Sequence, residues 1–234
     1  MLKKYHTLIG NELTGSSEFG LYGHDTLEVY KESLKTQPID WHYRTHRVFY
    51  NRNSYGHRSC EPNELDSEFI MFVGCSNTVG TAVSLENTFP CIVSDQLKKS
   101  YYNLAVEGAG YDLISYNVNA WLTNFIKPSV VVINWPQIAR TFRFDNENVI
   151  PIGPWGQAYT ISKTHWDNYS SVIMTDYFEH YAEIIRHSLI ASLKLQNIKV
   201  VEVKEYSYKD YGRDVKHPGI ETHKEIANTI LEHL

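Results

Sequence analysis

The stretch Glu68-Phe-Ile-Met-Phe-Val-Gly-Cys-Ser-Asn-Thr78 decides the fold. Its apolar run, Phe69 to Val73, does not alternate with polar residues, so it predicts a strand buried on both faces, as in the middle of a parallel sheet. Gly74 and the small residues after it predict a turn at the carboxyl end of this strand, where open α/β sheets bind their ligands. Ser76 lies in this turn and is a candidate nucleophile. The alternative is a polar turn whose serine only begins the next helix.

Strand and helix patterns alternate from Ser67 to the end of the chain, which is typical of a doubly wound parallel sheet. The predicted strands are 69–73, 101–106, 129–133 and 198–203. The predicted helices are 88–99, 111–125, 165–195 and 221–234. Together these elements predict the α/β class, with three α/β/α layers around a mainly parallel sheet. Right-handed crossovers would then bring the carboxyl ends of the strands to one edge.

The first part of the chain, 1–65, is richer in polar and aromatic residues and predicts an amino-terminal arm, with the main domain at 66–234. A helix is expected from Asp25 to Lys35, because acidic residues lie in its first turn and its apolar residues have helical spacing. Pro38 ends it. The segment 41–50 alternates enough to predict a strand, followed by turn signals at 51–56.

A candidate base lies near the other end of the chain, in Arg213-Asp-Val-Lys-His-Pro-Gly219. Asp214 and His217 are three residues apart on a predicted loop. At this spacing the carboxylate can hold the imidazole while the imidazole faces a nucleophile. A serine hydroxyl needs such a base, since it is almost entirely protonated at neutral pH. The alternative for His217 is a surface histidine near a helix start.

In these blocks the sequence resembles the SGNH (GDSL-type) hydrolase family, whose serine block opens the domain and whose Asp-x-x-His block closes it. The resemblance covers roughly 67–234. It implies a flavodoxin-like fold and ester hydrolysis by Ser76, His217 and Asp214, with no metal or organic cofactor. The segment Asn103-Leu-Ala-Val-Glu-Gly108 is similar to the second block. By this similarity the backbone N–H groups of Ser76 and Gly108 form an oxyanion hole, although Gly108 also suits a simple turn.

Two positions depart from the family pattern. Cys75 replaces the usual aspartate before the serine, and we interpret it as a small packing residue. The third block, Gly-x-Asn-Asp in the family, is absent, because the sequence here reads Ile133-Asn-Trp-Pro-Gln-Ile-Ala-Arg140. Gln137 has suitable amide chemistry for an oxyanion donor, about one residue out of register. A branch of the family with tryptophan and arginine in this block looks more similar, which implies Trp135 and Arg140 in the site.

The stretch 141–164 shows no periodicity and carries several aromatic residues, which predicts a long loop over the site. Arg140 and Arg143 are candidates for binding a carboxylate of the substrate, because guanidinium groups bind carboxylates in a bidentate manner. The alternative is that these arginines pair with Asp145 and Glu147.

Composition excludes several other classes. The 234 residues have a net charge of −5 with no long run of one sign, so neither nucleic acid nor a membrane surface is an expected partner. The three cysteines are too few and too scattered for a disulfide framework, which fits a reducing compartment. No signal peptide or membrane span is recognised, so we expect a cytoplasmic or otherwise soluble protein.

The sequence therefore predicts a serine ester hydrolase that removes a small acyl group from a carbohydrate or a similar ester. The expected partner is a small-molecule or glycan ester. Two alternatives stay open. One is a binding or structural module that keeps the fold but has weak or no catalysis. The other is an O-acyltransferase that uses the same residues to transfer the acyl group to an alcohol.

Overall fold

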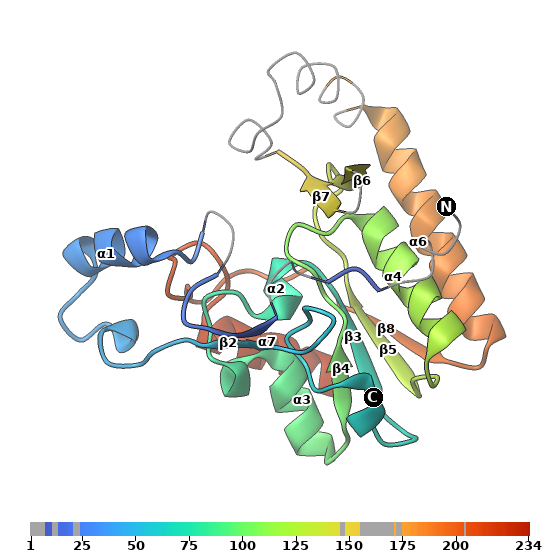
Figure 1. Ribbon diagram of the computed structural model, residues 1–234, viewed down its shortest axis with the longest axis horizontal. Helices are drawn as coiled ribbons and strands as arrows, with labels where there is room; N and C mark the ends of the chain where they lie inside the picture. Colours follow the sequence, from blue (N-terminus) through green and yellow to red (C-terminus); the bar gives the residue numbers. More distant parts are fainter. Residues whose placement is uncertain are drawn as a thin grey trace.

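The computed structural model describes residues 8–10, 14–20, 24–145, 148–154, 171, 175–203 and 205–234. Its centre is a four-stranded parallel sheet with the strand order β4-β3-β5-β8 (Figure 1). The strands are β3 (Ile70–Gly74), β4 (Tyr101–Asn103), β5 (Val130–Asn134) and β8 (Lys199–Glu202). Each lies within a stretch predicted as a strand or extends one residue beyond it. The predicted α/β class with a parallel sheet is confirmed.

Helices cover both faces of this sheet. The helices α3 (Phe89–Leu97) and α7 (Ile220–Leu231) pack together on one face, and α4 (Tyr111–Asn124) and α6 (Asp176–Leu195) pack together on the other (Figure 1). The central strand β3 serves both layers, because alternate residues point to opposite faces. Its Ile70 and Phe72 join the core beneath α3 and α7, whereas Met71 and Val73 join the core beneath α4. This is why its sequence is apolar without interruption.

The arm contains a helix and a small sheet. Helix α1 (Leu27–Thr36) begins after Thr26, whose hydroxyl accepts a hydrogen bond from the Val29 N–H at 3.3 Å. Strand β1 (Gly15–Ser17) pairs in antiparallel fashion with β2 (Tyr50–Arg52). The predicted helix is confirmed within about two residues. Whether residues 1–65 form a separate unit stays a prediction.

The predicted strand at 41–50 is wrong. The structure has a 3-10 turn at His42–Arg44, and only Tyr50 at the end of the segment belongs to a strand. Tyr43, Val48 and Tyr50 are buried together in a small core of the arm, but only Val48 and Tyr50 are two residues apart. A segment without a neighbouring strand can thus bury side chains that contribute to a strand pattern.

The prediction of a long loop at 141–164 is wrong for its first part. Strands β6 (Thr141–Asp145) and β7 (Asn148–Ile152) form an antiparallel hairpin. Each strand is short, and both carry polar residues. The pattern of their β-branched and aromatic residues is therefore too weak to predict strands from the sequence. Residues 155–170 of the predicted loop and helix lie outside the described residues. Helix α6 is described from Asp176, and its carboxyl end agrees with the prediction.

Cys60, Cys75 and Cys91 are free thiols. Of the helices that the structure describes, none combines the length and the apolar character that crossing a membrane requires.

Two histidines are completely buried. The His57 ring lies between the Tyr102 hydroxyl, 2.9 Å from Nδ1, and the Ile9 carbonyl, 3.1 Å from Nε2. His223 in α7 stacks on Phe89, and its Nδ1 accepts a hydrogen bond from the Phe89 N–H at 3.2 Å. Burial lowers the pKa of His57 to about 4 and the pKa of His223 to about 3. Both imidazoles are therefore neutral in the folded protein at neutral pH.

These histidines predict a loss of stability in weak acid. The unfolded chain binds a proton at each histidine near pH 6.5, whereas the folded protein does so only near pH 3 to 4. The contribution of the two neutral histidines to the free energy of unfolding is therefore fully present above about pH 6.5. It decreases as the pH falls through this window. Each histidine contributes about 2 kcal/mol of loss between pH 6.5 and 5.

Urea unfolding at pH 7 and pH 5 tests this expectation. His223→Gln keeps an acceptor for the Phe89 N–H but does not titrate. The variant should lose about 2 kcal/mol less than the wild type between the two pH values. Equal losses in the two proteins would contradict a buried neutral His223.

Candidate active site

Ser76 begins the short helix α2 (Ser76–Val79) directly beyond the carboxyl end of β3. The turn is tight because a Cβ on Gly74 would lie 2.1 Å from Thr78 Oγ1 and 2.8 Å from the Asn134 carbonyl oxygen. Gly80 ends the helix with φ of +76°, a conformation that favours glycine. Cys75 is buried in the core, which confirms its interpretation as a packing residue. Ser76 itself is half-buried.

A buried arginine of the arm holds the chain after α2. The guanidinium of Arg58 donates hydrogen bonds to the carbonyl oxygens of Gly80 at 2.7 Å and Val83 at 3.0 Å, and a longer one to Val79 at 3.3 Å. These groups end α2 or follow it, so they have no partner within the helix. Arg58 therefore fixes the position of the chain at the end of α2 and just after it.

Asp214 and His217 are joined as the sequence predicts. His217 Nδ1 lies 2.5 Å from Asp214 Oδ2. The other carboxylate oxygen accepts the backbone N–H groups of Lys216 and His217, both at 3.0 Å. Burial acts to raise the pKa of Asp214, but the hydrogen bond and charge of His217 and the two N–H groups outweigh it, and the net shift is downward. The ionised carboxylate holds the Nδ1 proton, which leaves Nε2 as the basic nitrogen.

Backbone and side-chain contacts bring this loop to the serine turn. The Arg213 N–H donates to the Ala82 carbonyl at 2.9 Å, six residues after Ser76. Asn77, the neighbour of Ser76, donates to the Tyr208 hydroxyl at 3.1 Å. The charge of Asp214 also acts on that hydroxyl. The two distant segments therefore lie at one edge of the sheet.

Ser76 and His217 are not hydrogen-bonded in the described structure. The contact of Ser76 Oγ is Cys75 Sγ, at 4.0 Å. Catalytic hydrogen bonds are often long or misaligned without substrate and tighten when it binds. The direct partnership of serine and histidine remains a prediction.

A buried ion pair ties the arm to this site. Arg213 Nε lies 2.8 Å from Asp25 Oδ1, and Arg213 Nη2 lies 2.8 Å from Asp25 Oδ2. Both side chains are 1% exposed. Tyr50 also donates to Asp25, and the Tyr50 oxygen accepts the Ala82 N–H at 2.7 Å. Sequence reasoning placed Asp25 only at a helix start, because a partner nearly 190 residues away leaves no local signal.

His24 adds a second histidine beside His217. Their ring centroids are 5.6 Å apart, edge to face. Burial lowers the pKa of His24, and the charges of His217 and Lys216 lower it further. His24 was not recognised in the sequence, where a lone histidine carries no pattern.

Gly108 has the geometry expected of a close-approach turn after β4. Its φ is +77°, which favours glycine. The preceding residue, Glu107, pairs with the buried side chain of Arg52 at 3.4 Å. In the described part of the chain, neither the Ser76 N–H nor the Gly108 N–H donates a hydrogen bond to another protein group. An oxyanion-hole role for these two donors remains a prediction.

The predicted site residues that follow β5 differ in their burial and in their contacts. Trp135 stacks on Tyr111 and donates its indole N–H to Glu202 at 2.9 Å. Gln137 is exposed. Arg140 is half-buried and close enough to Tyr208 for its charge to act on the hydroxyl. The side chain of Arg143 lies outside the described residues. Of this group, Arg140 is linked most directly to the serine and histidine segments.

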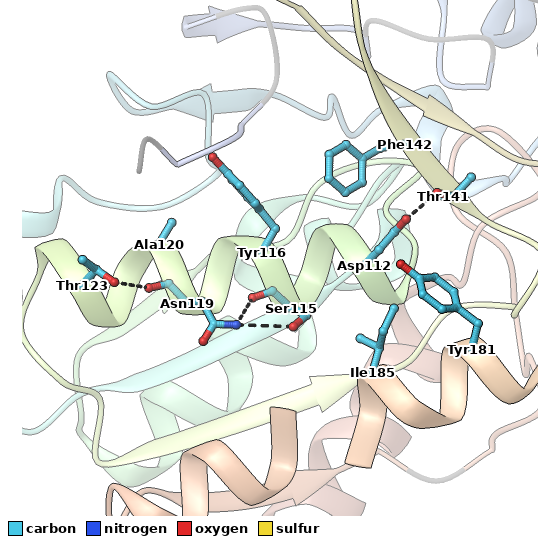
Figure 2. Close-up of a pocket in the computed structure, with 10 residues that line it drawn as sticks. All are labelled: Asp112, Ser115, Tyr116, Asn119, Ala120, Thr123, Thr141, Phe142, Tyr181 and Ile185. Atoms are coloured by element: carbon cyan, nitrogen blue, oxygen red, sulfur yellow. Dashed lines mark hydrogen bonds between the residues drawn. The ribbon is translucent and has the colours of Figure 1, made fainter. Parts of the chain in front are cut away.

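A separate cavity of about 680 Å³ lies along the outer side of α4, between β6 and α6 (Figure 2). Asp112 at its end accepts hydrogen bonds from the Thr141 hydroxyl and from the Leu113 N–H at 2.8 Å. Burial raises the pKa of Asp112, although these hydrogen bonds oppose it. None of the residues predicted for catalysis lines this cavity.

No model of a known protein family matches the sequence, and no curated protein matches it. Solved structures do match. A lipolytic protein of the G-D-S-L family from Veillonella parvula is 14% identical, with 70% of this chain and 97% of that chain covered and a TM-score of 0.37. A family two carbohydrate esterase from Clostridium thermocellum is 15% identical, with 74% and 65% covered and a TM-score of 0.40.

An acetyl xylan esterase from Butyrivibrio proteoclasticus is 12% identical, with 80% of this chain and 65% of that chain covered and a TM-score of 0.40. At these identities and TM-scores, no residue role is taken from the matches.

The buried pair predicts a large cost for Asp25→Asn. The amide leaves Arg213 as an uncompensated buried cation, which we expect to lower the free energy of unfolding by about 3–5 kcal/mol. Glu18→Gln is the matched control, since Glu18 pairs with an exposed Arg47 at 2.7 Å. That change should cost less than about 1 kcal/mol. Urea unfolding measures both, and similar costs for the two variants would contradict the assigned role of the buried pair.

Proposed function

We propose that the protein is a serine ester hydrolase that removes a small acyl group from a carbohydrate or a similar ester. The observation that supports this most is the contact between the buried Asp214 and the half-buried His217, 2.5 Å apart, on a loop that packs against the Ser76 turn. An oriented imidazole beside a serine is the arrangement that activates a hydroxyl. Both segments lie at the edge of the sheet where α/β folds bind ligands.

In the proposed reaction, His217 Nε2 accepts the Ser76 proton as Oγ attacks the acyl carbon. The negative charge that develops on the carbonyl oxygen receives hydrogen bonds from the N–H groups of Ser76 and Gly108. The C–O bond to the alcohol then breaks, and the alcohol leaves with the proton from His217. Water repeats the sequence on the acyl-enzyme and releases the acid. Asp214 stays ionised and orients His217 throughout.

The predicted third oxyanion donor is the weakest part of this site. Removing one such donor typically costs about 2.7–4 kcal/mol of transition-state stabilisation, so we expect a slow enzyme. Gln137 stays the predicted replacement, and its exposed side chain would have to turn toward the substrate. Trp135, Arg140 and Arg143 remain proposed substrate contacts.

A binding module without catalysis is the second candidate. The observation that favours it is that no hydrogen bond joins Ser76 to His217 in the described residues. Such a module would keep the edge of the sheet as a recognition surface. An activated serine and an inert serine react differently with an electrophile, which separates the two candidates.

Fluorophosphonate labelling provides this test. We expect the wild type to be labelled at Ser76 and Ser76→Ala to remain unlabelled, because only an activated hydroxyl attacks the phosphorus rapidly. Ser115→Ala, on the outer side of α4, is the matched control and should label like the wild type. A folded wild type that is not labelled would contradict the hydrolase and favour the binding module.

Asp214→Asn tests the role of the carboxylate. The amide cannot hold the His217 tautomer with Nδ1 as the donor, so we expect kcat to fall by roughly 10³- to 10⁴-fold with 4-nitrophenyl acetate. KM should change much less, because Asp214 is buried behind the histidine. A loss of less than tenfold in kcat would show that Asp214 is a structural loop residue only.

A further inference from the structure

Three tyrosines after β8 form a row beside the serine turn. The rings of Tyr206 and Tyr208 are stacked, with centroids 6.1 Å apart and planes 17° apart. Tyr211 meets Tyr208 edge to face, with centroids 5.8 Å apart. Tyr208 is 38% exposed and Tyr211 is 53% exposed, whereas Tyr206 is more buried. Two aromatic rings of this tyrosine row are thus open to solvent.

The tyrosine row is fixed relative to the nucleophile. Asn77 Nδ2 donates to the Tyr206 hydroxyl at 2.9 Å and to the Tyr208 hydroxyl at 3.1 Å. Asn134, at the end of β5, donates to the Tyr206 hydroxyl at 3.3 Å. Because Asn77 directly follows Ser76, the rings are anchored to the residue next to the serine. A ring held in this way loses little conformational freedom when a ligand packs on it.

The surroundings of the exposed rings are polar. Arg140 and Asp214 lie within electrostatic range of the Tyr208 hydroxyl. The chain around Tyr208 carries Ser207, Lys209 and Asp210. A ligand that presents C–H bonds on its face and hydroxyl groups at its rim would match aromatic faces surrounded by polar groups.

We propose that Tyr208 and Tyr211 form a subsite for a pyranose ring, the alcohol part of the ester. This inference rests on the proposed function, because it names the substrate class of the same site. The negative faces of the aromatic rings attract the C–H bonds of the sugar. Polar groups around the rings, Arg140 among them, would meet its hydroxyl groups. The sugar would then lie beside Ser76, with its ester oxygen toward the nucleophile.

Binding in the Ser76→Ala background tests the subsite without turnover. Isothermal titration with cellohexaose and with xylohexaose should show saturable binding of at least one sugar. Tyr211→Ala should weaken it by roughly fivefold or more, since it removes an exposed stacking ring. Tyr208→Ala should weaken binding as well, since it removes the other ring of the subsite. Tyr177→Ala is the matched control, because Tyr177 is 70% exposed on α6, and should bind like the parent.

The absence of saturable binding of both sugars would overturn the subsite, as would equal affinities for Tyr211→Ala and its parent. Tighter binding of ferulate than of either sugar, lost in Tyr211→Ala, would overturn the sugar assignment in favour of an aromatic acyl group. Fluorophosphonate labelling reports Ser76 without any sugar. If Ser76 is labelled but no sugar binds, the subsite proposal is wrong and the hydrolase proposal stands. If sugar binds in a tyrosine-dependent way but Ser76 is not labelled, the subsite proposal stands and the hydrolase proposal is wrong.

Discussion

The arrangement of the site depends on the buried ion pair between Asp25 and Arg213. Arg213 immediately precedes Asp214, so whatever fixes Arg213 also fixes the start of the histidine loop. Its guanidinium is held by both oxygens of Asp25, at 2.8 Å each. Two charges buried in this way are costly unless their geometry satisfies them, and alternative positions of the loop would leave each charge without its partner. The pair therefore favours one docked position of the loop.

The same part of the arm reaches all three segments that carry the proposed chemistry. Asp25 holds the histidine loop through Arg213, and Arg58 holds the carbonyl groups behind the serine helix. Arg52 pairs with Glu107, next to the glycine that is proposed as an oxyanion donor. Polar groups of the arm thus replace some of the positioning that a regular element would supply. Residues 24–58 therefore pack as an integral part of the fold around these three segments.

The sequence predicted those features that depend on local pattern. Buried strands such as 70–74 are recognised because both faces need apolar residues, and the spacing of Asp214 and His217 alone implied their contact. Long-range polar contacts leave no such trace, so the partners Asp25 and Arg213 were missed. The strand expected at 41–50 failed for a related reason, since a segment without a neighbouring strand can bury side chains that contribute to a strand pattern. The row of tyrosines was visible only as a high count of 17, without a location.

A crystal structure of the protein with a phosphonate bound covalently to Ser76 would test the central claim most directly, namely that the arm holds two distant segments together as one catalytic site. The account predicts His217 Nε2 within about 3 Å of Ser76 Oγ and a phosphonate oxygen that accepts the N–H groups of Ser76 and Gly108. It also predicts an intact Asp25–Arg213 pair. A His217 ring turned away from the phosphonate, with the loop undocked from Ala82, would contradict it.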